Sequence, residues 1–381
     1  MKTASRTTEE KLVAQETGAA DADGSVIYPW QEGVWTLLQG MRKALPHALL
    51  LYGAAGTGKR AFAEHFAKSL LCETQEGHAC SRCAPCRWFE QYAHPDYRRV
   101  QPDALEKDMR AEDTSDAPEE TTETAEAVGA GGSRPPRALS KIIRIDQIRA
   151  LRDLMGLSTH RGGPRVVCIF PAEALERESA NALLKMLEEP PAHTLFILVS
   201  NTPHAILPTI LSRCCRIAMP MPDFDMARTW LRAQGVETPE IWLAEQGGAP
   251  VSALEAARTG DRSDTDALLD ALASPDIATA LKMGESVVDR RWRASAVQIV
   301  TCLQRWLYDL LLMRMTGTHR YFPQRAKTLG KLAERVDLDE LLRLTKKMGE
   351  RKRTADHPLV LQLLIEDMLL DYNRLFPPSG K

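Results

Sequence analysis

Apolar residues in the first part of the chain gather in short continuous runs that stop at glycine, proline or polar residues. Unbroken runs of this kind are typical of strands that are buried on both faces of a parallel sheet. The runs are residues 45–53, 165–170, 193–200 and 214–219. Between them, apolar residues recur every three or four positions, which predicts helices at 62–71, 141–157 and 179–189. This alternation predicts an α/β domain with helices on both faces of a parallel sheet.

From Pro222 onward the strand-like runs disappear and the apolar residues follow helical spacing. Val300, Leu303, Leu307 and Leu310, for example, form one wide stripe on a single helix. Stripes of this width are typical of helix faces that pack into a core. The last part of the chain is therefore predicted to be all-α.

Composition fits a protein of two or three folded domains. The 381 residues are 44% apolar and 26% charged, with a formal net charge of −2. No apolar run approaches the ~18 residues that a membrane span needs, and residues 1–25 are polar without a signal-peptide pattern. We expect a cytoplasmic protein that does not contact a membrane and begins with a disordered leader.

The acidic residues are concentrated in one segment. Residues 101–128 contain ten Asp or Glu against two basic residues, and a stretch rich in glycine and proline follows. Such a segment cannot bury enough apolar surface to fold. Residues 101–138 are predicted to be a disordered insertion, and the rest of the chain is mildly basic.

A glycine-rich loop follows the first predicted strand. Gly53, Gly56, Gly58 and Lys59 fit the spacing of a phosphate-binding loop, whose backbone N–H groups and lysine hold phosphates. The next position normally carries Ser or Thr, whose hydroxyl binds Mg²⁺ during phosphoryl transfer, but here it is Arg60. We expect weak ATP binding or none.

A second part of an ATPase site is also missing. Hydrolysis needs carboxylates at the end of a core strand, yet the run 165–170 ends in Phe170 and Pro171. Glu173 comes two residues later and is interpreted as an ordinary acid at a helix start. No intrinsic ATP hydrolysis is expected.

Four of the eight cysteines lie close together with metal-ligand spacing. They are Cys72, Cys80, Cys83 and Cys86, in the pattern C-x7-C-x2-C-x2-C. Four thiolates complete the closed tetrahedral shell of a structural zinc site, which leaves no open position for catalysis.

Arg213 lies between Ser212 and Cys214, where the fourth predicted strand begins. An arginine fixed at a sheet edge can reach a nucleotide in a neighbouring subunit, but by residue type alone it is more often a surface cation.

Together these segments resemble the delta-prime subunits of the bacterial DNA polymerase III clamp loader, in the AAA+ superfamily. The resemblance extends over residues 29–257 and rests on the four-cysteine module and on these stretches: LPHALLLYG at 45–53, AHPDY at 93–97, NALLKMLEEPP at 181–191 and TILSRC at 209–214. It implies a RecA-like AAA+ domain at 26–220 with an inserted zinc module at 72–86, a helical lid at 221–260 and a helical collar for oligomerisation at 261–381.

The resemblance also implies a role and partners. Subunits of this family are stators that do not hydrolyse ATP but belong to the DNA polymerase III holoenzyme, a nucleotidyltransferase. Arg213 would be an arginine finger that acts in trans on an adjacent motor subunit, and Val251 stands where motors carry an arginine in the lid. The implied partners are the gamma or tau motor subunits and the delta subunit and, through the complex, primer-template DNA and the sliding clamp.

Two other readings of the sequence remain open. The first is an active clamp-loader ATPase of the gamma or tau kind, and ATP turnover by the isolated chain distinguishes it from a stator. The second is a zinc-dependent nucleic-acid binder, although no stripe of basic and aromatic residues supports it.

Overall fold

The computed structural model describes residues 27–74, 77–105, 140–155, 159, 162–260, 262–289, 295–354 and 361–376. The chain divides into two compact units, Met1–Met221 and Pro222–Lys381. The predicted leader and residues 106–138 of the predicted insertion lie outside the described residues. Within the described part, no helix is both long enough and apolar enough to span a membrane.

The first unit is built on a five-stranded parallel sheet with the order β2-β3-β4-β1-β5. The strands are β1 (Ala48–Tyr52), β2 (Tyr97–Val100), β3 (Arg165–Ile169), β4 (Thr194–Ser200) and β5 (Cys215–Ala218). β1 lies between β4 and β5, with Leu50 opposite Leu198 on one side and Arg216 on the other. The phosphate-loop residues therefore follow a strand that has a neighbour on each side.

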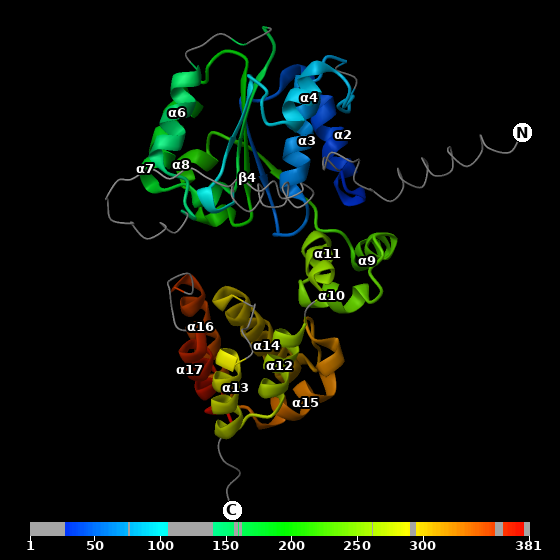
Figure 1. The fold of residues 1–381 in the computed structure, drawn as a ribbon, viewed down its shortest axis with the longest axis vertical. Helices are drawn as coiled ribbons and strands as arrows, with labels where there is room; N and C mark the ends of the chain where they lie inside the picture. Colours follow the sequence, from blue (N-terminus) through cyan, green and yellow to red (C-terminus); the bar gives the residue numbers. More distant parts are fainter. Residues whose placement is uncertain are drawn as a thin grey trace, which may run out of the picture. The chain divides into compact units, whose positions relative to one another are not determined.

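Helices cover both faces of the sheet, as the alternating pattern predicts (Figure 1). Because successive strand residues point to opposite faces, Leu49 and Leu51 pack with α2, α3 and α4, whereas Ala48 and Leu50 pack with α6, α7 and α8. The helices are α2 (Glu32–Met41), α3 (Lys59–Leu71), α4 (Ala84–Glu90), α6 (Ile145–Met155), α7 (Arg177–Glu188) and α8 (Pro208–Leu211). Short 3₁₀ turns are η1 (Pro29–Gln31), η2 (Arg42–Ala44), η3 (Ala172–Ala174) and η4 (Pro203–Ala205).

Strand β2 was not among the predicted strands. It has only four residues, Arg98 and Arg99 stand at its centre, and it lies at the edge of the sheet, where it pairs with β3. A short charged edge strand lacks the continuous apolar run that marks a central strand. The sequence pattern therefore found the three central strands and the more apolar edge strand β5, and missed β2.

Residues 101–105 correct the predicted start of the insertion. Gln101 is 4% exposed, and its carbonyl accepts a hydrogen bond of 2.9 Å from Gln147 Nε2 in α6. The N–H of Ala104 also bonds to the carbonyl of Ser140, at 3.0 Å. These contacts join the two ends of the insertion to the folded unit, so the acidic count alone placed the boundary a few residues too early.

The second unit is helical throughout its described residues, as predicted. Its helices are α9 (Phe224–Ala233), α10 (Pro239–Glu245), α11 (Pro250–Thr259), α12 (Ser263–Ala273), α13 (Ile277–Asp289), α14 (Ala296–Thr316), α15 (Ala326–Arg335), α16 (Leu338–Thr354) and α17 (Leu361–Asn373), with the 3₁₀ turn η5 (Pro323–Arg325). The predicted lid and collar both fall within this one compact unit, and their separation stays a prediction.

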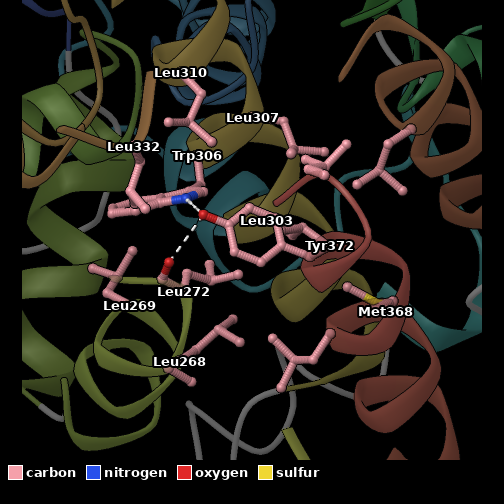
Figure 2. Packing of buried hydrophobic residues seen from close by; sticks show 14 of the residues in the cluster. Leu268, Leu269, Leu272, Leu303, Trp306, Leu307, Leu310, Leu332, Met368 and Tyr372 are labelled. Atoms are coloured by element: carbon pink, nitrogen blue, oxygen red, sulfur yellow. Dashed lines mark hydrogen bonds between the residues drawn. The ribbon is translucent and has the colours of Figure 1, made fainter. Parts of the chain in front are cut away.

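The core of the second unit is centred on α14, which brings the predicted apolar stripe against α12, α15, α16 and α17. Figure 2 shows Trp306 among these leucines, with its indole N–H donating to the hydroxyl of Tyr372 at 2.9 Å. That hydroxyl in turn donates to the carbonyl of Leu272 at 2.9 Å. The two large rings thus bury their apolar bodies without leaving these polar atoms unpaired.

Candidate functional site

The glycine-rich loop lies between β1 and α3, which is the strand–loop–helix context that a phosphate site requires. Gly56 and Gly58 have positive φ values of 71° and 81°, a conformation that glycine adopts without steric cost. Gly58 is also crowded, because a Cβ at this position would lie 2.1 Å from Cε2 of Tyr28. The segment just before α2 therefore packs directly against the loop.

Several polar groups of the loop are engaged within the protein. Lys59 is 3% exposed, and its Nζ donates to the carbonyl of Ala54 in the same loop. The carbonyl of Thr57 accepts hydrogen bonds from Trp30 Nε1 at 3.0 Å and from Gln31 Nε2 at 2.8 Å. A phosphate that entered here would have to draw the lysine away from the carbonyl that it contacts.

The surroundings of Lys59 also lower the pKa of its ammonium group. Burial lowers the pKa of its ammonium group to about 8, and the nearby Glu173 carboxylate only partly offsets this effect. Because a pKa near 8 leaves most of the ammonium groups charged at pH 7, the contact of Nζ with the Ala54 carbonyl opposes phosphate binding more than this shift does.

Arg60 and Phe170 contact each other. The guanidinium carbon of Arg60 lies 5.4 Å from the centroid of the Phe170 ring, a cation–π arrangement. Arg60 Nε is also 3.3 Å from Glu64 Oε1, one turn later on α3. Arg60 replaces the hydroxyl residue that would bind Mg²⁺, and Phe170 stands where a carboxylate would be needed, so these two positions contact each other. A positive charge therefore lies where Mg²⁺ would need oxygen ligands.

Glu173 has a role that the sequence reading missed. It lies in η3, and its Oε1 accepts the backbone N–H of Asn201 at 3.0 Å, directly after β4. The carboxylate joins the ends of β3 and β4 and acts electrostatically on Lys59. Interpretation as an ordinary helix-start acid was incomplete, because its partner is 28 residues away and no local spacing signals it.

The four clustered cysteines are brought together as their spacing predicts. Their sulfur atoms all lie within 4.8 Å of one another, with 3.9 Å between Cys72 and Cys83 and 4.0 Å between Cys80 and Cys86. Zn–S bonds of about 2.3 Å in a tetrahedron place sulfur atoms about 3.8 Å apart. The donor set and its dimensions therefore fit one tetrahedral zinc ion.

Local hydrogen bonds favour the thiolate form that a metal needs. The backbone N–H of Cys80 donates to the sulfur of Cys72 at 3.3 Å, and that of Cys83 donates to the sulfur of Cys80 at 3.4 Å. Burial raises the pKa of Cys72, but the hydrogen bonds from Thr74 and Cys80 outweigh it and lower that pKa to about 6. Burial raises the pKa of Cys86 instead, so this thiol depends most on a bound cation to ionise.

A buried lysine attaches this cysteine module to the sheet domain. Lys68 in α3 is 1% exposed, and its Nζ lies 2.9 Å from Ser81 Oγ and 2.9 Å from Glu90 Oε1 in α4. Cys86 is buried in the first turn of α4, four residues before Glu90. The module is therefore held to α3 by polar contacts as well as by the apolar packing of Phe89.

Arg213 lies in the turn between α8 and β5, with its side chain 34% exposed. Its NH1 donates to the carbonyl of Thr209 at 2.9 Å and to Ser212 Oγ at 3.3 Å. Its NH2 forms an ion pair of 2.6 Å with Oε1 of Glu188, the last residue of α7. The arginine is thus accessible but held in a defined position.

The family model described as "DNA polymerase III, delta subunit" matches residues 30–223. The chain belongs to this family. The match covers the whole sheet domain, including the glycine-rich loop, the cysteine module and Arg213. The predicted resemblance to delta-prime subunits is confirmed.

Individual relatives agree with the family match. The chain is 38% identical over 232 residues to the DNA polymerase III subunit delta' of Pseudomonas aeruginosa and 29% identical over 233 residues to that of Escherichia coli K12, and each match covers 60% of both chains. It is also 30% identical over 246 residues to the subunit tau of Bacillus subtilis, covering 63% of this chain and 36% of tau. The chain thus spans about three fifths of the length of the two delta' relatives.

Proposed function

We propose that the chain is a stator subunit of the DNA polymerase III clamp loader, which loads the sliding clamp onto primed DNA. In this proposal it hydrolyses no ATP itself and supplies Arg213 to the ATP site of an adjacent gamma or tau motor subunit. The membership of the delta-subunit family and the similarity to delta' proteins support this assignment. The delta subunit is the other proposed partner, and primer-template DNA and the clamp are reached through the complex.

The contact between Arg60 and Phe170 is the observation that carries the non-hydrolysing role. A hydrolytic site needs oxygen ligands for Mg²⁺ beside the phosphate loop, because the metal neutralises charge as the phosphoryl group transfers. Here a guanidinium and an aromatic ring contact each other at those two positions. The engaged Lys59 and the uncharged Val251 in α11 support the same reading.

The placement of Arg213 supports a role in trans. Arginine suits this task because its guanidinium stays charged and binds phosphate oxygens in a planar, directed way. Its 34% exposure leaves the group within reach of another chain, and three contacts limit its freedom. A preoriented cation stabilises transition-state charge at little reorganisation cost.

The cysteine module is proposed to bind one structural zinc ion through Cys72, Cys80, Cys83 and Cys86. The four sulfur atoms and their spacing support this assignment. With four thiolates bound, no coordination position remains for water. The metal would stabilise the loop between α3 and α4 and take no part in hydrolysis.

A motor function is the alternative that the similarity to tau raises. The chain would then need its phosphate loop during clamp loading. The same loop is dispensable in a stator, so a change at Lys59 separates the two functions.

Reconstitution tests the proposed assembly. When the chain is mixed with motor and delta subunits, we expect one complex that contains all of them and loads clamps onto primed DNA, with loading lost when the chain is omitted. A Lys59→Met variant, which removes the loop's charge at similar volume, should assemble and load as the wild type does. Failure of the chain to enter the complex, or loss of loading in Lys59→Met with assembly intact, would contradict the stator role.

A further inference from the structure

Arg213 is held from outside its own turn by a glutamate of the stretch NALLKMLEEPP at 181–191, whose role no sequence pattern indicates. Glu188 ends α7, and its carboxylate contacts Arg213 NH2 at 2.6 Å. The two residues are 25 positions apart in the chain, so no local pattern connects them. From this contact we propose that Glu188 is a positioning residue for Arg213, an inference that rests on the proposed finger role.

The core beneath the pair fixes the distance between the two side chains. Leu183 and Leu187 of α7 are buried in the same apolar cluster as Ile210 of α8, at exposures of 0%, 1% and 1%. Glu188 follows Leu187 directly, and Arg213 lies three residues after Ile210. Both charged groups therefore extend from rigid, co-packed elements, which lets the carboxylate define where the guanidinium lies.

Two anchored nitrogen atoms fix the orientation of a planar guanidinium. NH1 is held by the Thr209 carbonyl and Ser212 Oγ, and NH2 by Glu188. Among the described residues, Arg213 Nε has no contact partner. Because NH1 and NH2 are both held, the edge of the guanidinium that carries Nε–H points in a fixed direction. Removing the Glu188 anchor leaves NH1 as a pivot about which the group can swing.

The ion pair between Glu188 and Arg213 contributes little to the stability of the fold. The Glu188 side chain is 49% exposed and that of Arg213 34% exposed, and exposed ion pairs contribute little to folding because water and salt screen them. Because this ion pair adds little to stability but restrains Arg213, we interpret it as a contact that sets the position of the guanidinium. Misplacing a reacting group by about 1 Å can cost up to ~10²-fold in rate.

The test compares Glu188→Ala, Glu188→Gln and Arg213→Ala in the reconstituted complex. At saturating ATP, Glu188→Ala should lower hydrolysis at the adjacent motor site on the order of tenfold, since the finger is displaced but not removed. Glu188→Gln keeps an oxygen that accepts from NH2 and should stay within about twofold of wild type. The double variant Glu188→Ala/Arg213→Ala should be no slower than Arg213→Ala, because Glu188 acts only through the arginine.

Exposed Glu189 gives a matched control of equal charge, and Glu189→Ala should hydrolyse at the wild-type rate. A wild-type rate in Glu188→Ala, a faster rate in that variant, or a further loss in the double variant would each overturn the positioning role. If Arg213→Ala itself has no effect, the finger role fails instead. The two proposals are therefore distinguishable within one set of measurements.

Discussion

Arg213→Ala should slow ATP hydrolysis at the motor site beside this chain by about 10³-fold or more, the range that arginine fingers contribute. In the proposed role, the guanidinium stabilises charge on the phosphoryl group that transfers in the neighbouring subunit. Assembly should be unaffected, because the side chain is 34% exposed and its ion pair contributes little to folding. Single-turnover hydrolysis by the complex on primed DNA measures the effect.

Total steady-state hydrolysis by the complex should fall less than this single site, since other motor sites do not use Arg213. If clamp loading depends on hydrolysis at this site, loading should fall together with it. The nearby cation Arg216, which is exposed in β5, is the control, and Arg216→Ala should leave hydrolysis unchanged. Equal single-turnover rates for Arg213→Ala and wild type would show that the arginine does not complete a neighbour's site.

Cys83→Ser should lose the bound metal almost completely, from one zinc per chain to near none. Three thiolates and a hydroxyl cannot form the closed sulfur shell, and structural zinc contributes apparent binding energies of about 10–16 kcal/mol in small zinc modules. Without it, α4 keeps its contacts through Lys68 and Phe89, but the loop between Cys72 and Cys83 loses its cross-link. Metal analysis of the purified chain and limited proteolysis of this loop measure the two effects.

Cys302→Ser in α14 is the matched control, because it removes a thiol outside the cluster and should retain one zinc per chain. The sheet domain should remain folded in Cys83→Ser, since its two apolar clusters do not depend on the module's sulfurs. Wild-type protein that carries no zinc, or Cys83→Ser that retains a full equivalent, would contradict the zinc site.

The sequence predicted the parts of the fold that rest on local apolar patterns. The three central strands, the edge strand β5 and the helical second unit follow from runs and stripes that each segment displays by itself. Strand β2 could not be found this way, because Arg98 and Arg99 are charged and its place in the sheet depends on pairing with β3. Burial of Gln101 likewise depends on α6, which lies beyond the acidic segment.

The candidate site shows the same division. Cysteine spacing predicted the convergence of four sulfurs, because cysteines with two residues between them can reach one ion. The sequence also showed that a hydroxyl is missing at Arg60 and an acid at Phe170. It did not show that these two residues contact each other. The roles of Glu173 and Glu188 arise from partners 28 and 25 positions away and only the folded chain brings them together.

The central claim is that the site beside the phosphate loop cannot use magnesium. ATP turnover by the isolated chain tests this claim most directly. Wild type and Lys59→Met should release phosphate at the same background rate with Mg²⁺ and ATP, while a motor subunit assayed alongside turns over. Turnover at a motor-like rate that Lys59→Met abolishes would contradict the account, because the chain would then be hydrolysing ATP at its own loop.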